Sequence, residues 1–334
     1  MALPLSVLDL APVPSGVSAS TALRRTVDLA RLADELGFVR LWYAEHHSMP
    51  SVGSSAPEVL IANAAAATKR LRLGSGGIML PNHSPLRVAE LFRTLNALHP
   101  GRIDLGLGRA PGSDQNASRA LRAFDGEQFP YLLSELLAFD GRNGGFPDKH
   151  PFHSVRAQPE DAPLPPIWIL GSSGASAALA GAAGMGYSFA SHFSPTPAAP
   201  AFDAYRAAFQ PSTQFAEPHA ILGVAVCCAE TQERAEHLAS TMELGWLRIR
   251  SGRYLPLPTP EEALAYPYTD SERARIADYR KLTIVGSPET VRDELLRRAA
   301  ECGASEVMMT SNIHAHAARL RSYELVASAL QQSV

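Results

Sequence analysis

Residues 167–176 have the sequence IWILGSSGAS, in which an apolar run is followed directly by glycine and serine. Four consecutive apolar residues that end at a glycine indicate a short buried strand. The residues after Ser176 are rich in alanine as far as Gly184, which indicates a helix that starts at the serines. A strand, a short polar loop and a helix in this order form one unit of a parallel α/β sheet.

The same unit repeats along the whole chain of 334 residues. The candidate strands are Leu3–Val13, Phe38–Ala44, Leu71–Leu80, Arg102–Leu107, Ile167–Leu170, Tyr187–Ala190, Ala220–Cys228 and Ser305–Thr310. Each is followed by sequence with a helical period. Eight such units over this length fit a closed barrel, whereas an open dinucleotide-binding sheet needs about half of it. The sequence therefore predicts an α/β fold, a (β/α)8 TIM barrel, with residues 1–334 in a single domain.

Signals for helix ends support this division of the chain. The first helix ends at Gly37, and Pro85 takes the first position of a later one. Ser287-Pro288 opens a helix that Gly303 closes.

One segment, residues 245–282, is rich in proline, tyrosine and charged residues and interrupts the last repeat. Long insertions on barrels usually form lids over the active site, and the alternative is a solvated excursion without a role.

Composition excludes several classes of protein. With 46% hydrophobic and 19% charged residues the chain is an ordinary globular protein, and its formal net charge of -3 offers no basic face for nucleic acid. Its apolar runs are shorter than the roughly 18 residues of a membrane span, and residues 1–13 lack the features of a signal peptide. Three cysteines, two of them adjacent at Cys227 and Cys228, predict neither a disulfide framework nor a zinc site. We therefore expect a cytoplasmic protein without membrane or nucleic-acid partners.

Polar residues and glycines repeatedly follow a predicted strand. They are Glu45-His46-His47, Pro81-Asn82-His83, Gly108-Arg109, Gly171-Ser172-Ser173-Gly174 and Ser191-His192-Phe193. In a TIM barrel the residues after the strands gather at the carboxyl-terminal face, where these enzymes carry out their chemistry. We therefore expect all five groups at one face.

Two of these groups have the chemistry of a phosphate site. Free N–H groups at a helix start bind phosphate, so Gly171, Ser172, Ser173, Gly174 and Ser176 form a candidate cradle. An ordinary serine-capped helix is the alternative interpretation. At the end of the fourth strand Arg109 is placed to clamp a phosphate with two hydrogen bonds, although a structural salt bridge would also place an arginine there.

The histidine pair and the glycine run are the other candidates. Adjacent side chains on an extended segment point to opposite sides, so one of His46 and His47 faces the barrel interior, as a candidate acid, base or hydrogen-bond partner. Taken alone, a histidine at such a position is more often structural than catalytic. Residues 74–77, Gly-Ser-Gly-Gly, lie within a predicted strand. Glycine there marks a bulge or a ligand lying against the backbone.

Five ordered stretches of the chain resemble successive signatures of the bacterial luciferase-like monooxygenase family. They are Trp42–His47, Leu73–Pro85, Gly101–Arg109, Trp168–Ser173 and Val285–Val291. The similarity extends from the first strand to the last helix, and it is greater to the luciferase-like oxidoreductases than to true luciferase. The resemblance implies a TIM barrel that binds flavin mononucleotide (FMN) at its carboxyl-terminal face.

The resemblance also implies roles for individual positions. His46 falls where the family's luciferases keep a catalytic histidine, with Glu45 and His47 beside it. Ser75-Gly76 falls where the family has a non-prolyl cis peptide against the flavin ring, and His192 falls near a residue that lines the ring pocket. Arg109, Ser173, Gly174 and Ser176 match positions that contact the flavin phosphate in the family.

The resemblance further implies a reaction and its partners. Reduced FMN would react with O2 to oxygenate a small organic substrate, and a separate NAD(P)H reductase would supply the reduced FMN, because the chain has no dinucleotide fingerprint. Gly108 stands where luciferase has a reactive cysteine, so light emission and a long-chain aldehyde substrate are not implied. Family members commonly form homodimers, for which the alanine-rich helix Pro57–Thr68 is the candidate interface.

Three alternatives stay open. A deazaflavin coenzyme serves hydride transfer in relatives on the same barrel, but its acidic tail needs more cationic groups than Arg109 alone. A metal-dependent hydrolase would need a pair of histidines after the first strand, whereas His314 and His316 lie in the last loop. A non-catalytic flavin-binding protein is the third alternative.

Overall fold

The computed structural model describes residues 3–122 and 125–331. The strands in these residues are β1 (Leu5–Asp9), β2 (Arg40–Tyr43), β3 (Arg72–Ser75), β4 (Ile78–Met79), β5 (Ile103–Gly108), β6 (Ile167–Gly171), β7 (Gly186–Ala190), β8 (Ala220–Cys228), β9 (Thr283–Gly286) and β10 (Glu306–Thr310). The α-helices are α1 (Ala19–Leu36), α2 (Pro57–Ala67), α3 (Pro85–Leu98), α4 (Gln115–Leu121), α5 (Phe129–Phe139), α6 (Gly174–Ala182), α7 (Ala199–Ala208), α8 (Gln232–Arg250), α9 (Pro260–Ala265), α10 (Asp270–Arg280), α11 (Pro288–Cys302) and α12 (His316–Gln331). Short 3-10 helices are η1 (Leu80–Asn82), η2 (Gly126–Gln128) and η3 (Arg142–Gly144).

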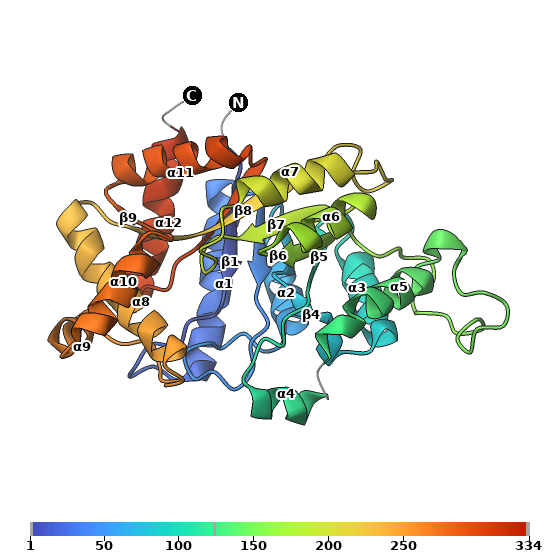
Figure 1. Ribbon diagram of the computed structural model, residues 1–334, viewed down its shortest axis with the longest axis horizontal. Coiled ribbons are helices and arrows are strands. Elements are labelled where there is room, and N and C mark those ends of the chain that lie inside the picture. The colour runs from blue at the N-terminus through green and yellow to red at the C-terminus, as the bar shows by residue number, and fades with distance from the viewer. Residues whose placement is uncertain (1–2, 123–124, 332–334) are drawn as a thin grey trace.

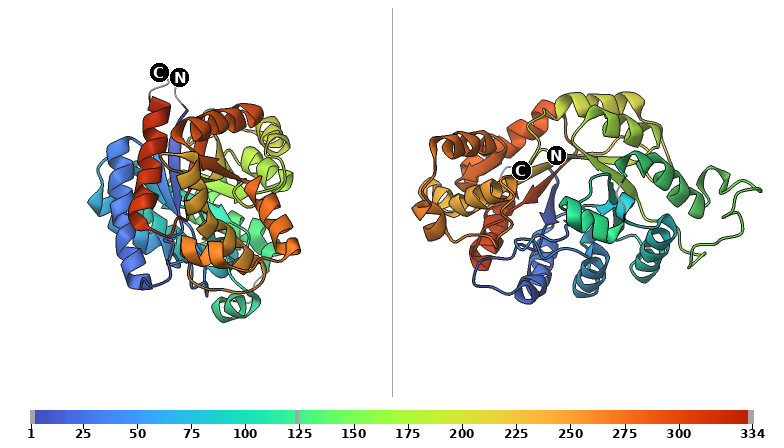
Figure 2. Two further views of the ribbon diagram at one scale, coloured as in Figure 1. Left: turned by 90° about the vertical axis from the view of Figure 1, so that its left-hand side faces the viewer. Right: turned by 60° about the horizontal axis from the view of Figure 1, so that its bottom comes forward.

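The strands close into a ring. Every strand pair is parallel, and β10 pairs with β1 on one side and with β8 on the other. Around the ring the order is β1, β2, β3, β5, β6, β7, β8 and β10, while β4 continues the path of β3 along β5 and β9 pairs with the far end of β8. Helices surround the strands on the outside (Figures 1 and 2). The predicted (β/α)8 TIM barrel is confirmed.

A bulge interrupts the predicted strand 71–80. The pairing with β5 changes from Gly74 opposite Asp104 to Ile78 opposite Leu107, so three residues of this strand lie opposite two of β5. A bulge of this kind is what glycine within a strand predicts. It divides the predicted strand into β3 and β4.

The cis peptide lies one residue beyond the expected bond. It joins Gly76 to Gly77, not Ser75 to Gly76. The backbones of β5 and the bulge also approach closely here, because a Cβ on Gly77 would lie 2.7 Å from the carbonyl oxygen of Gly106. A side chain at position 77 would therefore force the two strands apart.

Two other elements differ from the prediction. The first strand ends at Asp9 instead of Val13, because the chain turns at Ala11, which has a φ of 50°. A ninth barrel-associated strand, β9, was not predicted from the sequence, because its four residues directly precede the helix signal at Ser287-Pro288. The predicted helix ends are confirmed: Gly37 and Gly303 close α1 and α11 in the left-handed conformation.

The inside of the barrel is a packed core at the middle of its height. Side chains that point inward form one buried cluster, which contains Leu8, Trp42, Trp168, Ile221 and Met308. The indole rings of Trp42 and Trp168 meet edge to face with centroids 5.4 Å apart. Because these side chains fill the interior, the barrel is not a pore, and ligands must bind at its ends.

The amino-terminal end of the barrel is closed by buried charges. Arg40 donates from Nη1 to Asp104 Oδ2 at 2.8 Å and from Nε to Glu306 Oε1 at 2.9 Å. Arg72 also pairs with Asp104, and His219 Nε2 lies 2.9 Å from Glu306 Oε2. These residues come from different strands or their leading loops, so the network joins strands across the barrel. Buried charges need such partners to be tolerated.

The segment 245–282 forms the end of α8, the helices α9 and α10, and the loops between them (Figure 1). A small buried cluster joins α8 to α9. The segment also contacts the loop after β1, because the N–H of Leu257 donates to Val13 O at 2.9 Å and the carbonyl of Leu257 accepts from Ser15 N at 2.8 Å. In residues 3–122 and 125–331 no helix is both long enough and apolar enough to cross a membrane.

Candidate active site

The carboxyl ends of the parallel strands meet at one end of the barrel, which we call the mouth. The loops that follow β2, β4, β5, β6 and β7 all leave at this end, so the five predicted polar groups lie at one face. Helix α4, which follows β5, lies beyond the mouth and apart from the ring of outer helices (Figure 1, and Figure 2, left).

His46 follows β2 and is mostly buried. Its backbone N–H donates to Ser54 O at 3.0 Å, and its Nδ1 lies 3.3 Å from the carbonyl oxygen of Gly112. A carbonyl accepts hydrogen bonds, so Nδ1 carries the proton in the neutral ring and Nε2 keeps a lone pair. Burial lowers the pKa of His46 below its usual value. His46 is therefore a neutral hydrogen-bond acceptor at neutral pH.

His192 follows β7, which lies across the ring from β2. Burial, together with the nearby His46, lowers the pKa of His192 to about 4. Its ring lies against β8, where a Cβ on Gly223 would come within 3.1 Å of Nδ1, and Nδ1 makes no hydrogen bond of normal geometry with a described residue. The exposed ring of Phe193 meets the imidazole edge to face at 4.8 Å. Two neutral imidazoles therefore lie near each other at the mouth, from opposite strands.

Glu45 is buried beneath the surface of the mouth, and its side chain is 1% exposed. Burial alone would raise its pKa, but hydrogen bonds from His47, His83 and the backbone N–H of Met79 lower it to about 2. Glu45 is thus ionised at neutral pH and fully occupied by its neighbours. This geometry suits a residue that holds others in place better than one that exchanges protons with a substrate.

His47 and His83 both point at the Glu45 carboxylate. Nε2 of His47 lies 3.0 Å from Oε1, and Nε2 of His83 lies 2.9 and 3.0 Å from the two carboxylate oxygens. The amide of Asn82 donates to the same carboxylate at 3.2 Å. Asn82 and His83 were noted in the sequence as residues after a strand, but that position alone did not single them out as members of the site.

Ser75 and Gly76 lie at the bulge after β3. The Ser75 hydroxyl is buried, donates to Gly106 O at 2.8 Å and accepts from Gly106 N at 3.0 Å. Its side chain is therefore committed to the neighbouring strand. A Cβ on Gly76 would come within 2.6 Å of Leu8 and 3.1 Å of Trp42, so this half-buried glycine faces the inside of the barrel.

The start of α6 is open. Ser173 takes the N-cap position, but its side chain makes no capping hydrogen bond. Instead the hydroxyl of Ser176 donates to Ser173 O at 2.9 Å, and a Cβ on Gly174 would meet no atom within 4 Å. Gly171 is required for this turn, because a Cβ there would lie 2.0 Å from the Ser176 hydroxyl. Exposed Ser173 and Gly174 leave the first N–H groups of the helix accessible.

Arg109 follows β5 beside this helix start. Leu107 lies opposite Ile169 in the β5–β6 pairing, so continuing the register places Arg109 level with Gly171. The side chain is exposed and makes no ion pair with any residue in the described part of the chain. A structural salt bridge was the alternative role for Arg109, and no described residue provides the acidic partner that it would need.

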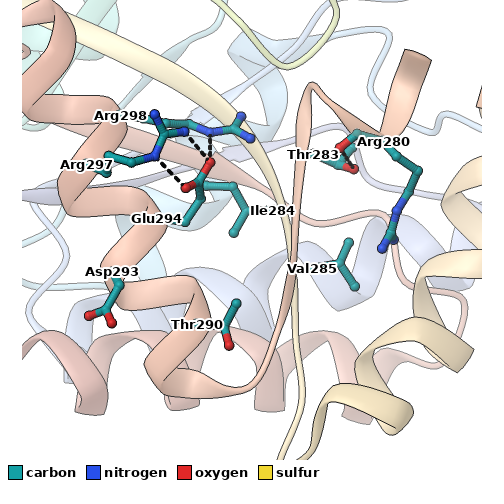
Figure 3. Close-up of a pocket in the computed structure, with 9 residues that line it drawn as sticks. All are labelled: Arg280, Thr283, Ile284, Val285, Thr290, Asp293, Glu294, Arg297 and Arg298. Carbon is teal, nitrogen blue, oxygen red and sulfur yellow. Dashed lines mark hydrogen bonds and ion pairs between the residues drawn. The ribbon is translucent and has the colours of Figure 1, made fainter. Parts of the chain in front are cut away.

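Two other kinds of site, a metal site and a hollow outside the barrel, do not match the predicted site residues. Across residues 3–122 and 125–331 there is no group of three or more metal-binding side chains, and His314 and His316 contact Ser15 and Asp28 respectively. Figure 3 shows a hollow of about 590 Å³ beside β9 and α11, in which Arg297 and Arg298 both pair with Glu294. It lies outside the barrel and far in the chain from the predicted site residues.

Comparison with known proteins identifies the family of the chain. The model of the luciferase-like monooxygenase family matches residues 3–306. The chain belongs to the luciferase-like monooxygenase family. A luciferase-like monooxygenase from Escherichia coli is 43% identical over 96% of this chain and 95% of its own. An N-acetyl-S-alkylcysteine monooxygenase from Bacillus subtilis is 36% identical over 98% of both chains. These relatives span the whole barrel.

Solved structures agree with this membership of the luciferase-like monooxygenases. The crystal structure of apo-MsnO8 has a TM-score of 0.89 and 39% identity, and the match covers 99% of this chain and 98% of the other. More distant structures share the fold alone. They include the oxygenating constituent of 3,6-diketocamphane monooxygenase from Pseudomonas putida in complex with FMN, with a TM-score of 0.73 and 19% identity. An F420-dependent secondary alcohol dehydrogenase has a TM-score of 0.67 and 12% identity.

Proposed function

We propose that this luciferase-like monooxygenase uses reduced FMN and O2 to oxygenate a small organic substrate at the mouth of the barrel. The open start of α6 beside the unpaired Arg109 is the observation that carries the proposal. Backbone N–H groups at a helix start and a guanidinium together match the charge and hydrogen-bonding needs of a phosphate. The residues present therefore fit the phosphate of FMN.

Each residue of the cradle has a part in this proposal. Gly174 leaves room for the phosphate to approach the helix start, and the uncapped Ser173 hydroxyl is free to donate. Gly171 and Ser172 form the turn that leads from β6 into α6, and Ser176 fixes that turn through Ser173 O. Arg109 supplies the positive charge.

The histidines act at the other side of the mouth. When bound, reduced flavin supplies the electrons for oxygen activation. His46 offers the Nε2 lone pair to an N–H or O–H group of the flavin or substrate and can take up a proton there. His192, which is also neutral, lines the site opposite and adds no charge to it. His47 and His46 both bind the carbonyl oxygen of Gly112, and Glu45 holds the His47 ring, so these two residues help to position His46.

The bulge and the insertion complete the proposed site. Gly76 has no side chain, so a planar ring can approach the backbone of the bulge closely, while Leu8 and Trp42 fill the space on the interior side of Gly76. The insertion 245–282 is proposed as the lid that keeps water from the mouth, supported by the pairing of Leu257 with the loop after β1. In this proposal residues 1–334 work as one domain.

Partners follow from the same proposal. A separate NAD(P)H-dependent reductase supplies reduced FMN. The chain is proposed to form a homodimer through the alanine-rich helix α2, which exposes Val59 (61% exposed). The thiols of all three cysteines are buried and unpaired, which suits a reducing cytoplasm.

Deazaflavin-dependent hydride transfer is the second candidate function. Arg119 on α4 is exposed and makes no ion pair with any residue of 3–122 or 125–331. A coenzyme with a longer acidic tail would find in Arg119 a second cation beyond Arg109.

Titration of the purified chain separates the candidates. Oxidised FMN, reduced FMN and the deazaflavin coenzyme are each titrated by fluorescence or calorimetry into wild type, Arg109→Ala and Arg31→Ala. Arg31 is an exposed arginine on α1 and is the matched control. Binding of FMN that weakens in Arg109→Ala alone supports the proposal. Binding of the deazaflavin with no binding of FMN in either redox state makes hydride transfer the function.

A chain that binds FMN still has to be shown to react. Reduced FMN bound to wild type and to His46→Phe is mixed with O2, and its reoxidation is followed by absorbance. Equal rates for both proteins and for free reduced FMN would favour a flavin-binding protein without catalysis.

A further inference from the structure

The Glu45 carboxylate joins two segments of the mouth that are separate in sequence, residues 45–47 and residues 79–83. It accepts hydrogen bonds from His47 on the loop after β2, from Asn82 and His83 in and after η1, and from the backbone N–H of Met79 at 2.8 Å in β4. Its side chain is 1% exposed, so a ligand at the mouth does not reach it. All four donors depend on one buried anion.

Two of these partners also hold a third segment. We call residues 109–122 the mouth flap, which begins at Arg109 and contains α4. Asn82 Nδ2 donates to Pro111 O at 3.0 Å, and the backbone N–H of His47 donates to Gly112 O at 3.0 Å. The first turn of the mouth flap is therefore tied to residues that bind Glu45.

The far end of the mouth flap is tied to the same network. Nη1 of Arg122 donates to the carbonyl oxygen of His83 at 2.9 Å, and the His83 ring donates to Glu45. Between these two ends α4 lies out from the barrel (Figure 1, and Figure 2, left). The one residue of α4 that is buried is Ser118. The mouth flap thus depends on its two ends for its position.

We propose that Glu45 is the positioning residue for Arg109, because it fixes both ends of the mouth flap through Asn82, His47 and His83. Arg109 makes no ion pair with a described residue, so the backbone of the flap sets where its guanidinium lies. The effect on ligand binding rests on the proposed function, in which Arg109 holds the FMN phosphate. The effect on the flap does not rest on it.

Glu45→Gln is the variant that tests this inference. The amide has the size of the carboxylate, but its NH2 group would face a donor in place of an acceptor, whichever way it turns, because both carboxylate oxygens accept hydrogen bonds. The matched control is Asp140→Asn. Asp140 is a buried carboxylate that pairs with Arg93 and accepts from Leu164 N, in a segment remote from the mouth flap.

Hydrogen exchange of the unliganded protein gives the first readout. In Glu45→Gln the peptides that cover residues 109–122 are expected to exchange about tenfold faster, because opening of the flap loses a charge-assisted hydrogen bond. Peptides of α6 are expected to keep their wild-type rates in this variant. Asp140→Asn is expected to leave the flap unchanged. Equal exchange of the flap in wild type and Glu45→Gln would overturn the inference.

A double-mutant cycle for FMN binding gives the second readout. Glu45→Gln is expected to weaken binding about tenfold and Arg109→Ala about ten- to a hundredfold, and the double variant is expected to bind about as Arg109→Ala does. Losses that multiply in the double variant would show that Glu45 does not act through Arg109. If wild type binds no FMN, the proposed function fails. Hydrogen exchange of the mouth flap then tests by itself whether Glu45 fixes the flap.

Discussion

The two ends of the barrel differ in how their charged side chains are paired. At the amino-terminal end Arg40 lies between Asp104 and Glu306, each of which has a further cationic or histidine partner. At the mouth one carboxylate, that of Glu45, is enclosed by donors, while Arg109 and the Nε2 atom of His46 have no partner in the described ranges. At the first end the charges pair with one another, whereas at the second a guanidinium and an imidazole nitrogen are left without a described partner.

This difference separates stability from function within one fold. Charges that satisfy one another across strands fix the strands and leave nothing to bind. An exposed guanidinium and two neutral imidazoles contribute little to folding, but they are available to a ligand. Substitutions at the amino-terminal end should therefore change stability, and substitutions at the mouth should change binding.

The largest effect is expected for Arg40→Met. Removal of the guanidinium leaves Asp104 and Glu306 buried without their shared cation, which costs about 3–5 kcal/mol of unfolding free energy. Urea denaturation followed by circular dichroism measures the loss. Arg31→Ala on the surface should change stability by less than about 0.5 kcal/mol. A loss of similar size in both variants would remove the distinction between the two ends.

Arg109→Ala should show the reverse pattern. Its unfolding free energy should stay within about 0.5 kcal/mol of wild type, because the side chain is exposed and unpaired. Its affinity for FMN should fall about ten- to a hundredfold, the range of a lost charged hydrogen bond. Calorimetric titration and urea denaturation of the same sample give both numbers. A lower unfolding free energy with unchanged FMN affinity would show that Arg109 stabilises the fold and does not bind the phosphate.

The pH dependence of stability should reveal the His83–Glu45 pair. Burial opposes protonation of His83, but its hydrogen bond to ionised Glu45 raises the pKa of His83 above its usual value. The stabilisation is therefore complete below pH of about 6.5 and is lost as the pH rises through the higher pKa of the folded state. The half-buried pair should contribute at most about 1 kcal/mol. Wild type and His83→Gln, compared by urea denaturation between pH 5 and 9, roughly the range in which histidine titrates, should converge at high pH. A constant difference would contradict the pair.

Gly174→Ala should give the smallest change. A Cβ at this position meets no protein atom within 4 Å, so the fold should gain up to about 1 kcal/mol from the lower flexibility of alanine. The same methyl group lies at the proposed phosphate site and should weaken FMN binding several-fold. Gly303→Ala is the control, because its φ of 63° makes alanine unfavourable there and binding should not change. Unchanged FMN affinity in Gly174→Ala would show that the phosphate does not bind at the start of α6.

The sequence predicted the barrel and the face of the site because both follow from local order. Each strand is marked by a short apolar run, and parallel strands bring the residues that follow them to one end, which places His46, Arg109, Ser173 and His192 together. The bulge was also foreseeable from the glycines at 74–77. Family resemblance placed the cis bond one residue too early.

The partners of each site residue could not be predicted in this way. Glu45 contacts His83, which is 38 positions away in the chain, through an encounter that depends on the register of two strands and on side-chain rotamers. The sequence therefore presented Glu45 as a catalytic candidate beside His46, whereas its burial and its four donors favour a supporting role. The short strand β9 was missed because a run of four residues carries little periodic signal.

The way β8 divides its pairing has an evolutionary consequence. Its first half, Ile221–Ala225, pairs with β10 and closes the ring, whereas Ala225–Cys228 carries β9 beyond the ring. The insertion that leads into β9 therefore attaches outside the hydrogen bonds that hold the barrel together. Residues 245–282 can diversify in length and composition from one descendant to the next without reopening the barrel. If this segment is the lid, as proposed above, changes in it would alter the substrate site while the ring is inherited unchanged.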